Sequence, residues 1–218
     1  MNASLRIFFK IVSIIFHPLL LPTYGTVLFL WANPSVQPQQ PIEKGEMLAP
    51  KFLLISVFVN TFFMPFVAIV MMKFLGFIKT FEMKDKMERI IPLIATMTFY
   101  MWAFMVVRGN FPYVPKIFKV FILGTVISVV LSFIINLGFK LSIHMVGVSG
   151  LLAAIMLMMI SSEKSLFLVL IGVVILSGLV ATARLYLKAH TIKELYFGFL
   201  VGLSSQMIAM IIYTQFAI

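Results

Sequence analysis

Apolar segments of about twenty residues recur along the whole chain and are separated by short polar stretches. This is the length that an α-helix needs to cross the hydrocarbon core of a bilayer. The pattern predicts an all-α fold, a polytopic helical transmembrane bundle of six to seven spans, with residues 1–218 forming a single domain. The predicted spans cover about 7–31, 52–77, 90–107, 118–139, 148–160, 166–187 and 195–216.

Two of these spans carry helix-breaking or polar residues. His17-Pro18 and Pro22 interrupt the first span, and we expect a kink there because each proline removes an intrahelical hydrogen bond. Through the fourth span and just beyond it, small and polar residues follow one another at steps of four, which predicts a seam that faces other helices. The residues at these steps are Gly124, Ser128, Ser132, Asn136, Lys140 and His144.

The composition supports the membrane assignment, because 62% of the residues are hydrophobic and only 11% are charged. The chain has no cysteine, which excludes disulfides, thiolate catalysis and cysteine-based metal sites. The histidines and acidic residues do not form a cluster with the spacing of metal ligands either, so we expect neither a metal nor a cofactor. The formal net charge of +10 indicates orientation in the membrane and attraction to anionic headgroups, and no nucleic acid partner. Most Lys and Arg residues fall on the side of the N-terminus, which we expect to face the cytoplasm.

The segment between the last two spans concentrates ionisable groups at the edge of the membrane. Arg184, His190 and Glu194 lie within eleven residues, where charged groups are costly and mark candidate functional sites. His190 and Glu194 are four apart, so on a helix they would share a face. Arg184 and His190 are six apart and would not, so the chain must turn between them. The alternative interpretation is a buried ion network that only fixes helix packing.

Three clusters fall on the same side of the predicted bundle, each at the boundary of a span. They cover residues 84–89, 144–150 and 184–194. Together they offer several cations, two histidines, a glutamate and a Ser-Gly pair whose backbone N–H groups could start a helix. This combination suits an oxyanion, above all a phosphate, because phosphate favours arginine and helix N-termini.

The spacing Arg184, five residues, His190, three residues, Glu194 resembles the third signature of the type 2 phosphatidic acid phosphatase superfamily. Residues 148–151, Val-Ser-Gly-Leu, resemble a degenerate form of its second signature, and residues 84–92 resemble a loose form of the first. His-Pro-Leu-Leu and Pro-Thr-Tyr-Gly, at 17–20 and 22–25, resemble the opening of small bacterial members. The order of the three signatures is that of the family.

The resemblance implies a role for each matching residue. His190 would attack phosphorus as the nucleophile, and Glu194 would hold its imidazole in the useful tautomer. Residues that would hold the phosphate are Arg184, Arg89, Lys84, Lys86, Ser149 and Gly150. The family needs no metal for this chemistry.

The chain also departs from the family pattern. Leu151 occupies the position of the second-signature histidine, which is the general acid of the family. His144 is the nearest replacement and our third catalytic candidate, although it could reach the site only if residues 145–148 fold it back. Glu82 stands where the first signature has its lysine, and Ala183 replaces the usual serine.

These features predict an integral membrane lipid phosphatase or phosphotransferase, in the inner membrane of a bacterium, that acts through a phosphohistidine. The expected partners are membrane lipids with phosphate headgroups, with a membrane protein complex or a homo-oligomer left open. The alternative is a catalytically impaired relative that serves as a lipid-binding or accessory subunit, which Leu151 favours. A phospholipid transporter is a third hypothesis, suggested by Asn60, Asn136 and Gln206 inside the spans.

Overall fold

A computed structural model describes residues 3–36, 50–80, 83 and 87–216, and all regular secondary structure in this part of the chain is helical. The helices are α1 (Ala3–Ile15), η1 (Pro18–Leu20), α2 (Leu21–Ala32), α3 (Pro50–Phe58), η2 (Val59–Phe63), α4 (Met64–Phe74), η3 (Met87–Arg89), α5 (Ile90–Asn110), α6 (Lys116–Gly138), α7 (Ile143–Met158), α8 (Phe167–Tyr186) and α9 (Ile192–Phe216).

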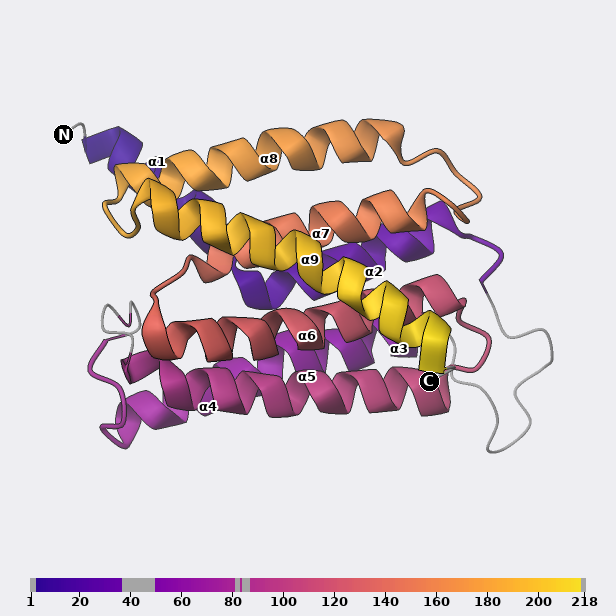
Figure 1. Cartoon of the computed structure of the whole chain (residues 1–218), viewed down its shortest axis with the longest axis horizontal. Coiled ribbons are helices and arrows are strands. Elements are labelled where there is room, and N and C mark those ends of the chain that lie inside the picture. Colours follow the sequence, from indigo (N-terminus) through magenta and orange to yellow (C-terminus); the bar gives the residue numbers. More distant parts are fainter. Residues whose placement is uncertain (1–2, 37–49, 81–82, 84–86, 217–218) are drawn as a thin grey trace.

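The long helices lie side by side along one axis, and the chain ends lie at opposite ends of the bundle (Figure 1). Within the described residues, six stretches are long and apolar enough to cross a membrane, and α7 is a shorter apolar helix. The predicted all-α polytopic bundle of six to seven spans is therefore confirmed. Large apolar side chains such as Phe74 and Leu168 are exposed on its outer surface, as expected for a protein whose solvent is lipid.

The first span breaks at the position that the prolines predict. Helix α1 ends at Ile15, His17 is the N-cap of the short 3₁₀ helix η1, and Pro18 is its first residue. Helix α2 then continues from Leu21 with Pro22 in its first turn, where a proline costs no hydrogen bond. The break turns the His17 side chain into the bundle instead of leaving it on a lipid-facing helix.

Helix α9 packs closely on α6 and α7 because glycines leave room at the contacts. A Cβ at Gly198 would lie 2.6 Å from the carbonyl oxygen of Ser142, and a Cβ at Gly202 would overlap the Ser149 hydroxyl. Gly124 of α6 receives the side chain of Gln206 in the same way. The predicted small and polar seam thus faces other helices over Gly124 to Asn136, but it ends there, because α6 stops at Gly138.

Helix α7 begins five residues before the predicted span. It runs unbroken over Ile143–Met158, so His144 lies in its first turn, on the same side as Leu151 two turns later. The expectation that the chain must fold His144 back to reach a site is wrong, because a regular helix already presents it there. The helix start expected at Ser149-Gly150 is not found either, since both residues lie in the helix interior.

Candidate functional site

The candidate site lies at the end of the bundle where α8 stops and α9 begins. Arg184 occupies the last turn of α8, and residues 187–191 form the turn that the spacing of Arg184 and His190 predicts. Lys188 has φ = 53°, a left-handed conformation that reverses the chain direction. Ala189 N–H donates to the carbonyl oxygen of Arg184 (3.1 Å), which closes the turn and brings His190 back toward the arginine.

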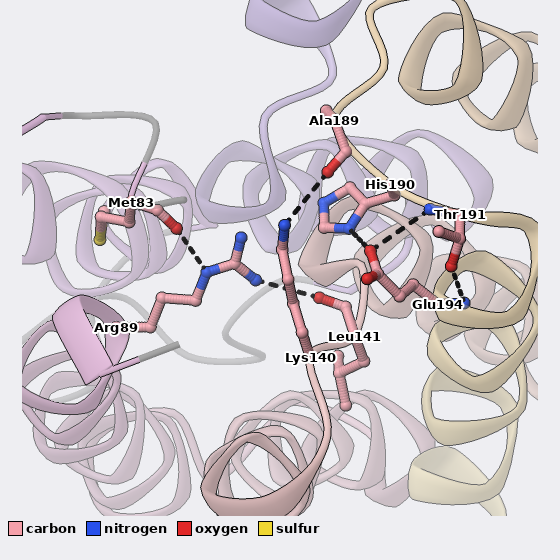
Figure 2. A network of polar contacts seen from close by, with 8 residues as sticks. All are labelled: Met83, Arg89, Lys140, Leu141, Ala189, His190, Thr191 and Glu194. Atoms are coloured by element: carbon pink, nitrogen blue, oxygen red, sulfur yellow. Dashed lines mark hydrogen bonds and ion pairs between the residues drawn. The ribbon is translucent and has the colours of Figure 1, made fainter. Parts of the chain in front are cut away.

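His190 and Glu194 meet, but not on one face of a helix, because His190 precedes α9. Thr191 is the residue before the helix, and its hydroxyl accepts a hydrogen bond from Glu194 N–H (3.3 Å). In return Glu194 Oε2 accepts from Thr191 N–H (3.4 Å), which completes a capping box. The same carboxylate oxygen lies 2.6 Å from His190 Nδ1 (Figure 2). The helix N-terminus therefore fixes the carboxylate that orients the imidazole.

The contacts of His190 leave one ring nitrogen free to react. Its Nδ1–H donates to the carboxylate, so the lone pair lies on Nε2, and the ring lines a cavity while its side chain is only 3% exposed. Burial lowers the pKa of His190 from 6.5 to about 4, the positive charges of Arg184 and Arg89 act in the same direction, and Glu194 opposes them. At neutral pH the imidazole is therefore unprotonated and able to attack.

Arg89 supplies a second cation from the opposite wall. It is the N-cap of α5 and is 8% exposed. Its Nε–H donates to the carbonyl oxygen of Met83 (2.8 Å), and Nη1 donates to that of Leu141 (3.1 Å). These bonds use two of the five guanidinium N–H groups and fix its plane beside the cavity. An arginine held in this way is already oriented for an anion.

The linker Phe139–Ser142 between α6 and α7 connects the two walls. Leu141 accepts the bond from Arg89, and Ser142 N–H donates to the backbone carbonyl of Glu194 (3.1 Å). Between them Lys140 Nζ donates to the carbonyl oxygen of Ala189 (3.4 Å), directly before His190 (Figure 2). Lys140 is not among the predicted site residues, and its place four residues after Asn136 in the predicted seam is the only sequence signal for it.

A cavity of about 370 Å³ joins these groups to the interior of the bundle. Its polar end is lined by His17, Arg89, His144, Arg184 and His190. Its remaining wall is mainly apolar and is formed by residues such as Leu21, Leu93, Phe121 and Leu151, with the buried side chains of Tyr100 and Gln206. The candidate site is therefore a mainly apolar pocket with arginine and histidine side chains gathered at one end.

The structure gathers most of the predicted site residues, but not all of them. Gly150 lines the cavity, whereas Ser149 is fully buried and its hydroxyl donates within α7 to the carbonyl oxygen of Met145 (2.7 Å). Lys84 and Lys86 lie outside the described residues. The described residues contain no group of three His, Cys, Asp or Glu side chains that could hold a metal ion.

His17 joins the site, although its position before Pro18 mainly predicts a kink. Its ring contacts that of His144 edge to face, with centroids 5.6 Å apart. The sequence signal for His17 in the site is its position directly before Pro18, because the helix break there turns its side chain toward the interior of the bundle. His144 itself donates from Nε2 to the carbonyl oxygen of Ser13 in α1 (3.1 Å).

The fold and the composition define an integral membrane protein, an all-α helical bundle with a buried cationic site at one end. Comparison of the chain with protein-family models, with curated proteins and with solved structures finds no match. The resemblance of its His190 segment to a phosphatase signature stays an expectation from the sequence.

Proposed function

We propose that the chain is an integral membrane phosphatase or phosphotransferase for a lipid phosphate, such as phosphatidate, a polyprenyl phosphate or a lipid-A-like glycolipid. The observation that supports this most is the arrangement of His190. Its Nδ1 is held by Glu194 at 2.6 Å, and its ring lines a pocket that also contains the Arg184 and Arg89 side chains. A nucleophile, its orienting carboxylate and two cations are the parts that phosphoryl transfer requires.

The reaction that we propose has two displacements. His190 Nε2 forms a bond to phosphorus as the bond from phosphorus to the lipid oxygen breaks, and the lipid leaves as an alcohol with a proton from solvent. Glu194 stabilises the imidazolium that carries the phosphoryl group, and the arginines neutralise its oxygens. Water then attacks phosphorus, the N–P bond breaks and phosphate is released with the second proton of that water returned to solvent. In a transferase a second alcohol replaces the water.

The apolar part of the pocket favours a lipid over a water-soluble ester. His190 and Gln206 both line the cavity, and from Glu194, the hydrogen-bond partner of His190, to Gln206 the α9 axis advances by about 18 Å, so the cavity extends far into the bundle. Phe66 of α4 lines the cavity and is itself 47% exposed on the outer surface. We propose that the hydrocarbon chain of the lipid enters the cavity beside Phe66 and lies inside it, while the phosphate of the same lipid lies at His190.

The first experiment measures phosphate release from the three lipid classes by the purified chain in detergent, for wild type and for His190→Gln. We expect release by wild type, loss of at least about 100-fold in the variant, and a labelled phosphohistidine that only wild type forms. Equal rates for the two proteins would remove the mechanism. The proposed location, the inner membrane of a bacterium, is checked separately by membrane fractionation.

A second experiment tests the chain-binding part of the cavity. Ser128 lines it, and the hydroxyl bonds only within α6, to the carbonyl oxygen of Thr125 (2.7 Å), so Ser128→Leu fills space without leaving a partner unsatisfied. We expect a higher KM for long-chain lipid phosphates and little change for a short-chain ester. The control is Thr182→Leu on the exposed face of α8, which should alter neither. The same change for both esters would contradict a chain in the cavity.

The alternative is a phosphatase-like subunit that binds a lipid phosphate without turnover. Leu151 favours it, because an apolar side chain that is 4% exposed lines the cavity in the second-signature histidine position. A general acid contributes about 10²–10⁴-fold to such a rate. A wild-type chain that binds lipid phosphate but releases none, together with no gain in Leu151→His, would support the subunit over the enzyme.

A further inference from the structure

His17 stands where the polar end of the cavity meets its apolar part. Along the chain it is the first of a run of lining residues that continues through Pro18 and Leu19 to Leu21 and Pro22. On α7 the lining likewise passes from His144 to Leu151. A lipid phosphate with its phosphorus beside the His190 ring and its chain along these two runs would have its bridging oxygen, the one between phosphorus and the lipid, near this junction.

His17 and His144 are neighbours, but their hydrogen bonds leave different ring nitrogens free to bind a ligand. His144 uses Nε2–H on the carbonyl oxygen of Ser13 (3.1 Å), in the last turn of α1, so this bond supports the break in the first span. His17 instead accepts at Nδ1 from Leu19 N–H (3.4 Å), as the N-cap of η1. When Nδ1 accepts, the ring hydrogen lies on Nε2. Within the described residues His17 Nε2 has no hydrogen-bond partner.

We infer that His17 contacts the substrate, and that its Nε2–H donates a hydrogen bond to the bridging oxygen of the lipid phosphate. The identity of the ligand rests on the proposed function. In-line displacement puts the leaving oxygen on the side of phosphorus away from the nucleophile, so the donor must come from a wall other than that of His190. The break before Pro18 provides this wall. The hydrogen bond grows stronger as negative charge develops on the leaving oxygen.

The test uses a variant that preserves the local structure. Asparagine is a good N-cap and can still accept from Leu19 N–H, but its side chain is too short to present a donor at the position of His17 Nε2. His17→Asn is therefore compared with wild type on two substrates, an alkyl phosphate and 4-nitrophenyl phosphate. The thermal midpoint Tm of each protein reports folding, and His17→Gln, whose amide N–H can reach the position of His17 Nε2, is the matched variant that should retain more of the rate than His17→Asn.

Turnover gives the first measurement. We expect His17→Asn to lower kcat/KM for the alkyl phosphate about 10- to 100-fold, but less than about threefold for 4-nitrophenyl phosphate, whose leaving oxygen spreads its charge into the ring. A residue that only shapes the site would lower both rates by the same factor. Equal losses, or no loss for the alkyl ester, would overturn the inference.

Binding gives a measurement that does not depend on turnover. On a His190→Gln background, an alkyl phosphate is compared with the phosphonate of equal length in which CH₂ replaces the bridging oxygen, at alkaline pH where both carry two charges. We expect the phosphate to bind about tenfold tighter and His17→Asn to abolish this difference. If wild type releases no phosphate, the proposed function fails, and this comparison alone decides about His17. An undiminished preference in His17→Asn would refute the contact.

Discussion

Replacing Glu194 by glutamine removes one charge from the site and keeps the shape of the side chain. In the folded chain Glu194 Oε2 lies 2.6 Å from His190 Nδ1 and also accepts from Thr191 N–H. A hydrogen bond to a charged group contributes about 1.5–3 kcal/mol, and tenfold in rate corresponds to about 1.4 kcal/mol. In the proposed reaction the imidazole becomes an imidazolium, so this bond would strengthen in the transition state. We therefore expect Glu194→Gln to lower kcat about 10- to 150-fold.

The assay is phosphate release from a lipid phosphate in detergent, with the Tm of each protein measured alongside. Glutamine at this position can still complete a capping box, so the Tm should change little. Glu194→Asp is the matched variant with the charge retained and one methylene removed, and we expect an intermediate rate. Lys193→Gln, at an exposed neighbouring position, is the control.

The reasoning is refuted if Glu194→Gln keeps its rate within a factor of about three. It is also refuted if the rate and the folded fraction fall together, because the pair then serves only to hold α9 in position. A loss of the phosphohistidine signal at unchanged Tm would support the orienting role.

Three further predictions concern the same end of the bundle and its packing. Burial lowers the pKa of His190, so acidification protonates it only as the pH approaches 4. A titration of the histidine NMR signals should therefore find the midpoint of His190 below pH 6.5, and a midpoint at or above 6.5 contradicts its burial. Lys140→Met removes a cation beside His190 and should lower kcat/KM about 10-fold, whereas Lys140→Arg keeps the charge and should retain most of the wild-type value. Unchanged kinetics in Lys140→Met would refute a role of this cation in the site. Gly202→Ala should destabilise the fold by about 1–3 kcal/mol because its Cβ overlaps the Ser149 hydroxyl, measured as Tm against Gly178→Ala, where the space is open.

Some of the site is encoded locally and could be predicted. The break at His17-Pro18 follows from proline chemistry, and the turn between Arg184 and His190 follows from their spacing. The contact of His190 with Glu194 was also expected, although the capping box achieves it in place of a helical face. Each of these depends on residues within a few positions of one another.

The contacts between distant segments were decided only by tertiary structure. Nothing near Lys140 indicates that it reaches Ala189, and nothing near Arg89 indicates that Leu141 accepts its bond. The side of α7 that faces the cavity was equally hidden, because this helix is apolar all round and its periodicity does not mark a buried face. As a result His144 and Gly150 line the cavity while Ser149 turns toward α9.

The sequence by itself determined that this protein is a bundle of membrane-spanning helices, because runs of apolar residues have one stable arrangement in lipid. It also determined where the first span breaks and where the chain turns before His190. The tertiary structure decided which helices pack together, and with them which cations and histidines surround one cavity. That choice depends on the fit between helix surfaces, above all at Gly124, Gly198 and Gly202; a local pattern can mark a seam such as the one at Gly124, but not the helix that packs on it.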